Sequence, residues 1–167
     1  MNLHLPVSSA DTQDRKIKGK SKYFVKQKSI KKIAIINGIN LAELGTREID
    51  VYGHTNFLSY IQTLRKKYPN IEIIDFQSNF VEDIANFMLQ HKNCDGIILN
   101  PGAFTHTSMI LADTIATIPA KVVEVHISNL YGRENFRKNS LIASKCCGSI
   151  CGFGLEGYEL ALYFLTR

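Results

Sequence analysis

Apolar residues in this chain occur in two alternating patterns. Short continuous runs predict buried β-strands in five segments, at residues 32–37, 71–75, 94–99, 121–125 and 149–153. Apolar residues spaced three or four positions apart predict helices in four further segments, at residues 55–67, 81–89, 107–118 and 155–165. Thr55 is the expected N-cap of the first helix, and Pro119 marks the end of the third.

Strands that alternate with helices, and that are almost entirely apolar, predict a parallel sheet covered by helices on both faces. Right-handed crossovers between such strands give an α/β domain with a flavodoxin-like, doubly wound topology. The 167 residues suffice for one domain with its own core. Ligands of such folds bind at the carboxyl edge of the sheet, so the loops that follow the strands are the candidate site.

Charge is distributed unevenly along the chain. Residues 1–32 hold nine Lys and Arg residues against two Asp residues, so the remainder carries a net charge of −2 although the whole chain carries +5. We expect residues 1–30 to form a disordered basic arm, and residues 31–167 to form a single catalytic domain. A targeting peptide is the alternative for the arm, but such peptides are usually Arg-rich and this segment is Lys-rich. Charge alone does not indicate a nucleic-acid partner.

Neither membrane insertion nor secretion is expected. No apolar run approaches the roughly 20 residues of a membrane span, and the N-terminal residues lack the apolar core of a signal peptide. The cysteines form no C-x-x-C pair and have no nearby histidine at zinc spacing. We expect them to be reduced, small core residues of a cytoplasmic protein, with a redox or metal role as the alternative; they are Cys94, Cys146, Cys147 and Cys151.

Polar loops follow three of the predicted strands. The first runs from Asn-Gly-Ile-Asn at 37–40 through a glycine-bracketed segment at 45–53. The second is Asn-Pro-Gly-Ala-Phe-Thr-His at 100–106, and the third begins with His-Ile-Ser at 126–128. Because the carboxyl ends of parallel strands meet at one edge of a sheet, we expect these loops to form one site.

Two pairs of residues in these loops indicate proton transfer. Tyr52 lies five residues after Arg47, and a phenol with its pKa of about 10 becomes a useful base only where a neighbouring cation stabilises its anion. His126 follows Glu124 by two positions, on the same side of the strand, where a carboxylate can fix the imidazole tautomer. Taken singly, a loop tyrosine is more often a surface aromatic, and a strand-end histidine is more often structural.

In this order and spacing, the three loops resemble those of type II 3-dehydroquinate dehydratases, the type II dehydroquinases, from about residue 33 to residue 165. The resemblance implies a five-stranded parallel sheet in the order 2-1-3-4-5. It implies a lyase of the shikimate pathway, in aromatic amino-acid biosynthesis, that dehydrates 3-dehydroquinate to 3-dehydroshikimate through an enolate. We expect no metal and no cofactor, because the sequence contains nothing that resembles a metal cluster, a P-loop or a dinucleotide-binding fingerprint.

The resemblance also assigns roles to individual residues. Tyr52 is the proton acceptor, with Arg47 as the cation beside it. His126 is the proton donor, and Asn40 helps to hold the enolate oxygen through a water. Six further residues are expected to bind the substrate: Asn100, His106, Asp113, Ile127, Ser128 and Arg137. Three are expected to support the others: Glu48, Glu124 and Arg133.

The resemblance further implies a homo-oligomer, a dodecamer built from trimers, in which Asp113 reaches a neighbouring subunit's site. Asp113 follows His106 by seven residues, about two helical turns, which predicts that both lie on one helix face. Without the resemblance, Asp113 is more simply a solvated helix carboxylate.

The first loop departs from the usual family pattern. Ile39 and Ile49 stand where prolines are common, which predicts a less pre-organised loop. Ala42 and Glu43 also differ, and Glu43 brings a negative charge near a site expected to take an anion. The alternative function is therefore a catalytically impaired oligomeric scaffold or small-anion binder. A flavin-binding electron carrier follows from the fold alone and is a weaker alternative.

Overall fold

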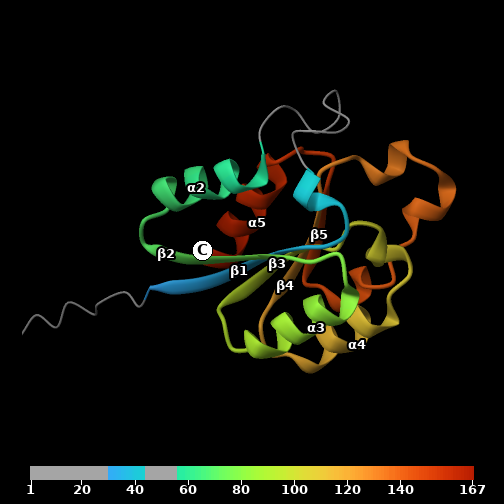
Figure 1. Cartoon of the computed structure of the whole chain (residues 1–167), viewed down its shortest axis with the longest axis horizontal. Helices are drawn as coiled ribbons and strands as arrows, with labels where there is room; N and C mark the ends of the chain where they lie inside the picture. The colour runs from blue at the N-terminus through green and yellow to red at the C-terminus, as the bar shows by residue number, and fades with distance from the viewer. Residues whose placement is uncertain (1–29, 44–55) are drawn as a thin grey trace, which may run out of the picture.

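The computed structural model describes residues 30–43 and 56–167. Five parallel strands form one sheet in the order β2-β1-β3-β4-β5 (Figure 1). This is the predicted doubly wound order, in which the chain starts in the middle of the sheet and builds outward in both directions. The strands are β1 (Lys31–Asn37), β2 (Ile71–Gln77), β3 (Gly96–Asn100), β4 (Val122–His126) and β5 (Gly148–Cys151).

Helices cover both faces of the sheet, as predicted (Figure 1). One face is covered by α2 (Phe57–Lys67) and α5 (Glu156–Thr166), and the other by α3 (Val81–Gln90) and α4 (Met109–Thr117). None of the helices in the described ranges is both long and apolar enough to cross a membrane.

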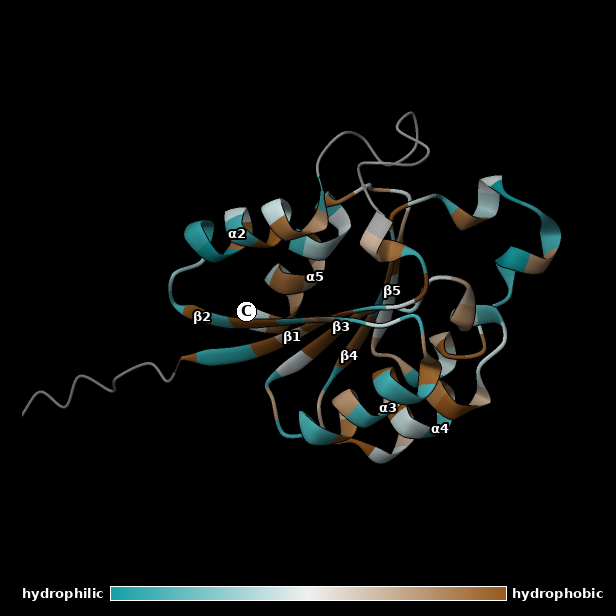
Figure 2. Cartoon of the chain, viewed as in Figure 1, coloured by the Kyte–Doolittle hydropathy of each residue, from teal (hydrophilic) through white to brown (hydrophobic). Residues whose placement is uncertain are grey.

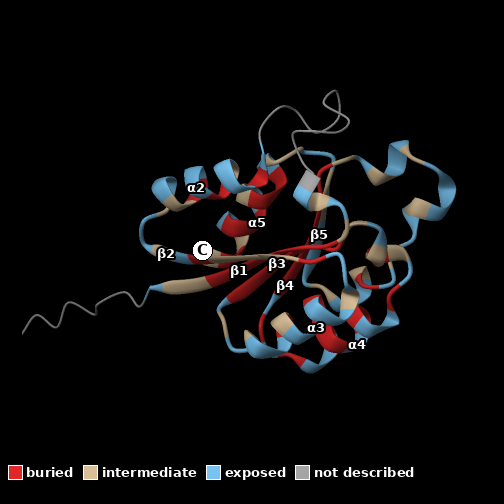
Figure 3. Cartoon of the chain, in the orientation of Figure 1, coloured by how far each residue is buried: buried red, intermediate tan, exposed pale blue. Residues whose placement is uncertain are grey.

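Successive residues of each central strand enter different cores. Ile33 and Ile35 of β1 pack in the core beneath α2 and α5, whereas Ala34 and Ile36 pack in the core beneath α3 and α4. Figure 2 shows the central strands as largely apolar after the hydrophilic start of β1, and Figure 3 shows them as mostly buried. This two-sided burial explains why the strands read as continuous apolar runs in the sequence.

The helix starts differ from the prediction in two places. Asn56, not Thr55, caps α2, because its side chain accepts a hydrogen bond from the Ser59 N–H at 2.8 Å. The helix predicted at 107–118 starts two residues later, at Met109, where Ser108 caps α4; a separate 3₁₀ turn, η2 (Gly102–His106), ends before it. His106 and Asp113 are therefore on separate elements, so the expectation that they share one helix face was wrong.

The prediction that the cysteines are core residues holds only in part: Cys94 and Cys146 pack against the core beneath α3 and α4. All four are free, but Cys147 is exposed and the others are only half-buried. Cys94 precedes β3 instead of beginning it, and its thiol bonds to the Gly96 carbonyl. Burial raises the pKa of Cys146 to about 12, so this thiol is a poor nucleophile.

Two of the polar loops are in direct contact at the carboxyl edge of the sheet. Gly38 follows β1, and a Cβ at this position would lie 2.2 Å from the Pro101 carbonyl oxygen. The Gly38 N–H donates to the Asn100 carbonyl at 2.7 Å. Glycine at position 38 therefore lets the β1 and β3 loops pack backbone against backbone, which brings their side chains to one place.

Candidate active site

A pocket of about 200 Å³ opens at this edge of the sheet. It is bounded by the loops after β1, β3 and β4, so the predicted convergence of three loops is observed. The described residues that line the pocket are Ile39, Asn40, Leu41, Asn100, Gly102, Ala103, His106, His126, Ile127, Ser128, Leu130, Arg133 and Arg137.

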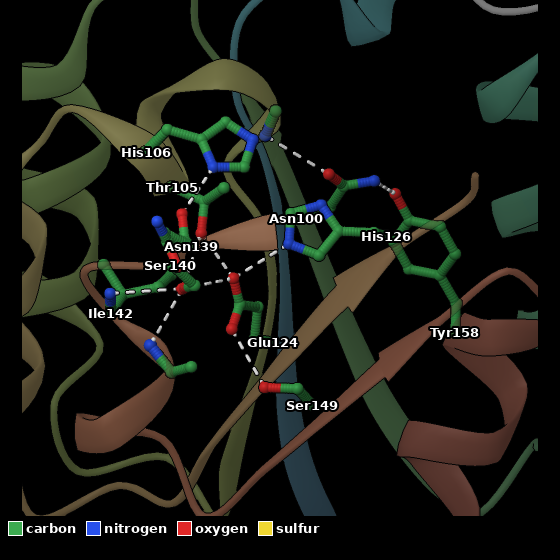
Figure 4. Close-up of polar contacts among 12 residues, drawn as sticks. Asn100, Thr105, His106, Glu124, His126, Asn139, Ser140, Ile142, Ser149 and Tyr158 are labelled. Atoms are coloured by element: carbon green, nitrogen blue, oxygen red, sulfur yellow. Dashed lines mark hydrogen bonds and ion pairs between the residues drawn. The ribbon is translucent and has the colours of Figure 1, made fainter. Parts of the chain in front are cut away.

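The Glu124 carboxylate lies buried behind the pocket among hydroxyl groups (Figure 4). Ser140 Oγ donates to Oε1 at 2.9 Å, Ser149 Oγ donates to Oε2 at 2.9 Å, and Thr105 Oγ1 also donates to Oε1. Burial alone would raise the pKa of this carboxyl, but hydrogen bonds from His126, Thr105 and Ser140 outweigh it and lower the pKa to about 2. Glu124 is therefore ionised at neutral pH.

His126 ends β4 and forms a pair with Glu124. Its Nε2 lies 2.8 Å from Glu124 Oε1, as the strand spacing predicted (Figure 4). Because an ionised carboxylate only accepts hydrogen bonds, the proton between these atoms resides on Nε2. The other ring nitrogen, Nδ1, is then the atom that can exchange a proton with a ligand in the pocket.

Acid should weaken the fold through Glu124. The pKa of this carboxyl is lowered from 4.5 to about 2 on folding, so its contribution is complete above pH 4.5 and is lost as the pH falls toward 2. The difference in free energy of unfolding between wild type and Glu124→Gln should shrink by at most about 3 kcal/mol over that range. This difference is measured by urea unfolding monitored by circular dichroism, because the chain has no Trp whose fluorescence could report on unfolding. A difference that does not change with pH would contradict the lowered pKa.

Asn40 is held at the pocket by an unusual backbone conformation. Its φ of 65° lies in the left-handed region, which asparagine tolerates better than most residues. The Asn40 N–H donates to Asn79 Oδ1 at 3.0 Å, and the same oxygen accepts from Gln77 Nε2 at 3.0 Å. The first loop is thereby anchored to the segment that follows β2.

The third loop supplies cationic groups. Arg133 Nη1 donates to Ser128 Oγ at 3.3 Å, and Arg137 Nε donates to Glu134 Oε2 at 2.9 Å. Among the side chains of residues 30–42 and 56–167, no acidic group lines the pocket, whereas Arg133 and Arg137 do. This charge balance favours an anionic ligand.

His106 faces the pocket from η2. Its Nδ1 lies 2.7 Å from the Asn139 carbonyl oxygen (Figure 4). A carbonyl only accepts, so Nδ1 carries a proton and Nε2 remains for a ligand.

Asp113 is the one predicted substrate-binding residue in the described ranges that does not line the pocket. Asp113 is exposed on α4. Arg47, Glu48 and Tyr52 lie outside the described residues, as do Ile49 and the side chain of Glu43.

The sequence did not single out the hydroxyl groups around Glu124. Thr105 lies in a loop already under consideration and precedes His106, so that loop contained a usable signal. The sequence contained no such signal for Ser140 and Ser149, because only the folded structure brings them next to Glu124. The parallel register places Ser149 of β5 beside Glu124 of β4.

Known proteins are similar to this chain in both sequence and structure. A family model described as dehydroquinase class II matches residues 31–166. The 3-dehydroquinate dehydratase of Caldicellulosiruptor saccharolyticus is 47% identical over 144 residues, covering 83% of this chain and 98% of that protein. The same-named protein of Bacillus cereus is 43% identical over 141 residues, covering 83% and 97%. The crystal structure of a type II dehydroquinase from Butyrivibrio crossotus matches with a TM-score of 0.80 and 40% identity, covering 83% and 99%.

Proposed function

This chain belongs to the class II dehydroquinase family, lyases that dehydrate 3-dehydroquinate to 3-dehydroshikimate in the shikimate pathway, and we propose that His126 is the acid of this reaction. The observation that carries the proposal is the pair that His126 forms with the buried Glu124 at the pocket wall. The experiment is steady-state kinetics of His126→Ala with 3-dehydroquinate, in which kcat should fall far more than KM rises.

The elimination needs a base as well as an acid. In our proposal the Tyr52 phenolate removes the proton next to the ketone, and the electron pair moves to the ketone oxygen as an enolate. The enolate then expels the hydroxyl group, which takes the proton from His126 Nδ1 and leaves as water. Arg47 stabilises the phenolate, and Asn40 helps to hold the enolate oxygen through a water.

The other pocket residues are proposed to hold the substrate. Ser128 and the backbone of Ile127 bind the carboxylate, near the two arginines of the third loop. Asn100, His106 and Arg137 bind the ring hydroxyls. This division is supported by the cationic lining and by the free Nε2 of His106.

An enolate intermediate agrees with the lining of the site. The described residues around the pocket include no lysine, and the sequence has none between residues 39 and 65. An imine with the substrate ketone would need such an amine. The proposed route therefore uses acid–base groups alone.

We also propose that the active unit is a dodecamer built from trimers, in which Asp113 reaches a neighbour's site. Asp113 is exposed on α4, near Met109 and Ile110, which are also exposed. Apolar side chains left exposed on a helix are suited to contact with another subunit. Residues 31–167 would form the catalytic domain of each subunit, as the family match from residue 31 supports. The four free thiols agree with a cytoplasmic location.

Substitution of Asp113 should reveal this assembly. Light scattering of the wild-type protein should give a mass several times the 18.8 kDa of the chain. Asp113→Ala should lower activity or mass while circular dichroism stays unchanged, because the change removes a contact between subunits. Glu82→Ala, an exposed carboxylate on α3, is the control and should do neither. A fully active monomer would contradict the proposal and leave Asp113 as a surface carboxylate.

A further inference from the structure

A chain of three buried side chains connects the pocket to α5. Asn100 Nδ2 donates to the Tyr158 hydroxyl at 2.8 Å (Figure 4), and that hydroxyl donates to Asn37 Oδ1 at 2.8 Å. Asn37 ends β1, Asn100 ends β3, and Tyr158 reaches both from the helix above the sheet. Tyr158 and Asn37 are fully buried, and of the three only Asn100 lines the pocket.

The direction of these hydrogen bonds is fixed by the backbone. The Gly102 N–H donates to Asn100 Oδ1 at 3.2 Å, and a backbone N–H cannot act as an acceptor. The Asn100 amide therefore presents its nitrogen to Tyr158. The tyrosine oxygen accepts that bond, so its own proton must go to Asn37 Oδ1. Reversing any one bond would leave two donors or two acceptors facing each other.

The environment of Asn37 indicates that the hydrogen bonds among these three side chains are strongly constrained. Its Nδ2 is buried and has no hydrogen-bond partner in the described ranges. A buried amide that leaves a donor unpaired is unfavourable unless its oxygen makes a bond that the structure requires. The required bond here is the one from Tyr158, whose proton has no other acceptor in this arrangement.

We propose that Tyr158 is a positioning residue that fixes the Asn100 amide for substrate. One N–H of Asn100 is used by Tyr158, and the other is aligned toward the ligand by the same planar geometry. Without the hydroxyl, the Asn100 nitrogen would turn to find another acceptor and would lose this alignment. The inference rests on the proposed role of Asn100 in binding the substrate.

A double-mutant cycle in kcat/KM for 3-dehydroquinate tests this proposal. Tyr158→Phe should lower kcat/KM by about tenfold, mostly through KM, which is the expected cost of one misaligned hydrogen bond. Asn100→Ala should lower it at least as much. The double variant should be no worse than Asn100→Ala alone, because Tyr158 acts only through Asn100.

Tyr60→Phe is the matched control. Tyr60 lies in the same aromatic cluster, with its ring centroid 6.2 Å from that of Tyr158, and its hydroxyl donates to the Leu155 carbonyl at 2.7 Å. This substitution removes a comparable hydroxyl with no connection to Asn100, so KM should not change. If Tyr158→Phe does not fold, Asn37→Ala replaces it, because it removes the acceptor of the Tyr158 proton without touching the pocket lining. It should also raise KM, and have no effect in the Asn100→Ala background.

The possible kinetic results distinguish the positioning role of Tyr158 from the substrate-binding role of Asn100. Impaired Asn100→Ala with unimpaired Tyr158→Phe would overturn the positioning role alone. Losses that multiply in the double variant would also overturn it, since Tyr158 would then act independently. Normal kinetics in Asn100→Ala would overturn the proposed role of Asn100, and the positioning role with it.

Discussion

Replacing His126 by alanine should lower kcat for 3-dehydroquinate by about a hundredfold to ten-thousandfold, the usual contribution of a positioned general acid. Proton donation to the leaving hydroxyl is needed only in the transition state, so KM should change much less. The imidazole is well placed for this role because Glu124 holds Nε2 at 2.8 Å and leaves Nδ1 for the pocket. Steady-state kinetics with the purified variant would measure both constants.

His91→Ala is the matched control for His126. His91 caps the end of α3, stacks on Phe87 and does not line the pocket. Its removal should leave kcat unchanged. An effect of His126→Ala on KM alone would make His126 a binding residue and would require another acid.

Tyr52→Phe should lower kcat by several orders of magnitude, while the protein should still bind the product 3-dehydroshikimate. The phenol oxygen is the proposed base, and phenylalanine keeps the ring but has no atom that can accept the proton. Kinetics measures the loss of turnover, and isothermal titration with the product measures the retained binding. Tyr163→Phe, an exposed position on α5, controls for loss of any one phenol. Activity of Tyr52→Phe within a few-fold of wild type would remove Tyr52 as the base.

Local patterns were enough to predict the architecture and the convergence of three loops on one pocket. Apolar runs identified all five strands, and the signal is strongest in β1, β3 and β4, which helices bury on both faces of the sheet. The strand spacing of Glu124 and His126 was enough to predict their pairing. Both predictions depend on neighbouring residues and on the geometry of a single element.

Features that depend on distant contacts could not be predicted in this way. Ser149 reaches Glu124 through the register between β4 and β5. Tyr158 reaches Asn100 across 58 positions of sequence. The helix predicted at 107–118 starts two residues later in the structure, because Ser108 caps α4. Helix caps depend on backbone angles that apolar spacing does not specify.

The most direct measurement is the initial rate at which full-length protein forms the conjugated product from 3-dehydroquinate, followed by ultraviolet absorbance. Tyr52→Phe at the same concentration serves as the blank. We expect saturable turnover in the wild type that is absent from the blank, since the pocket and the His126–Glu124 pair that lies at its wall are in place. A wild-type rate no higher than the blank, in protein that is folded and assembled, would contradict catalysis at this site and favour an anion-binding scaffold.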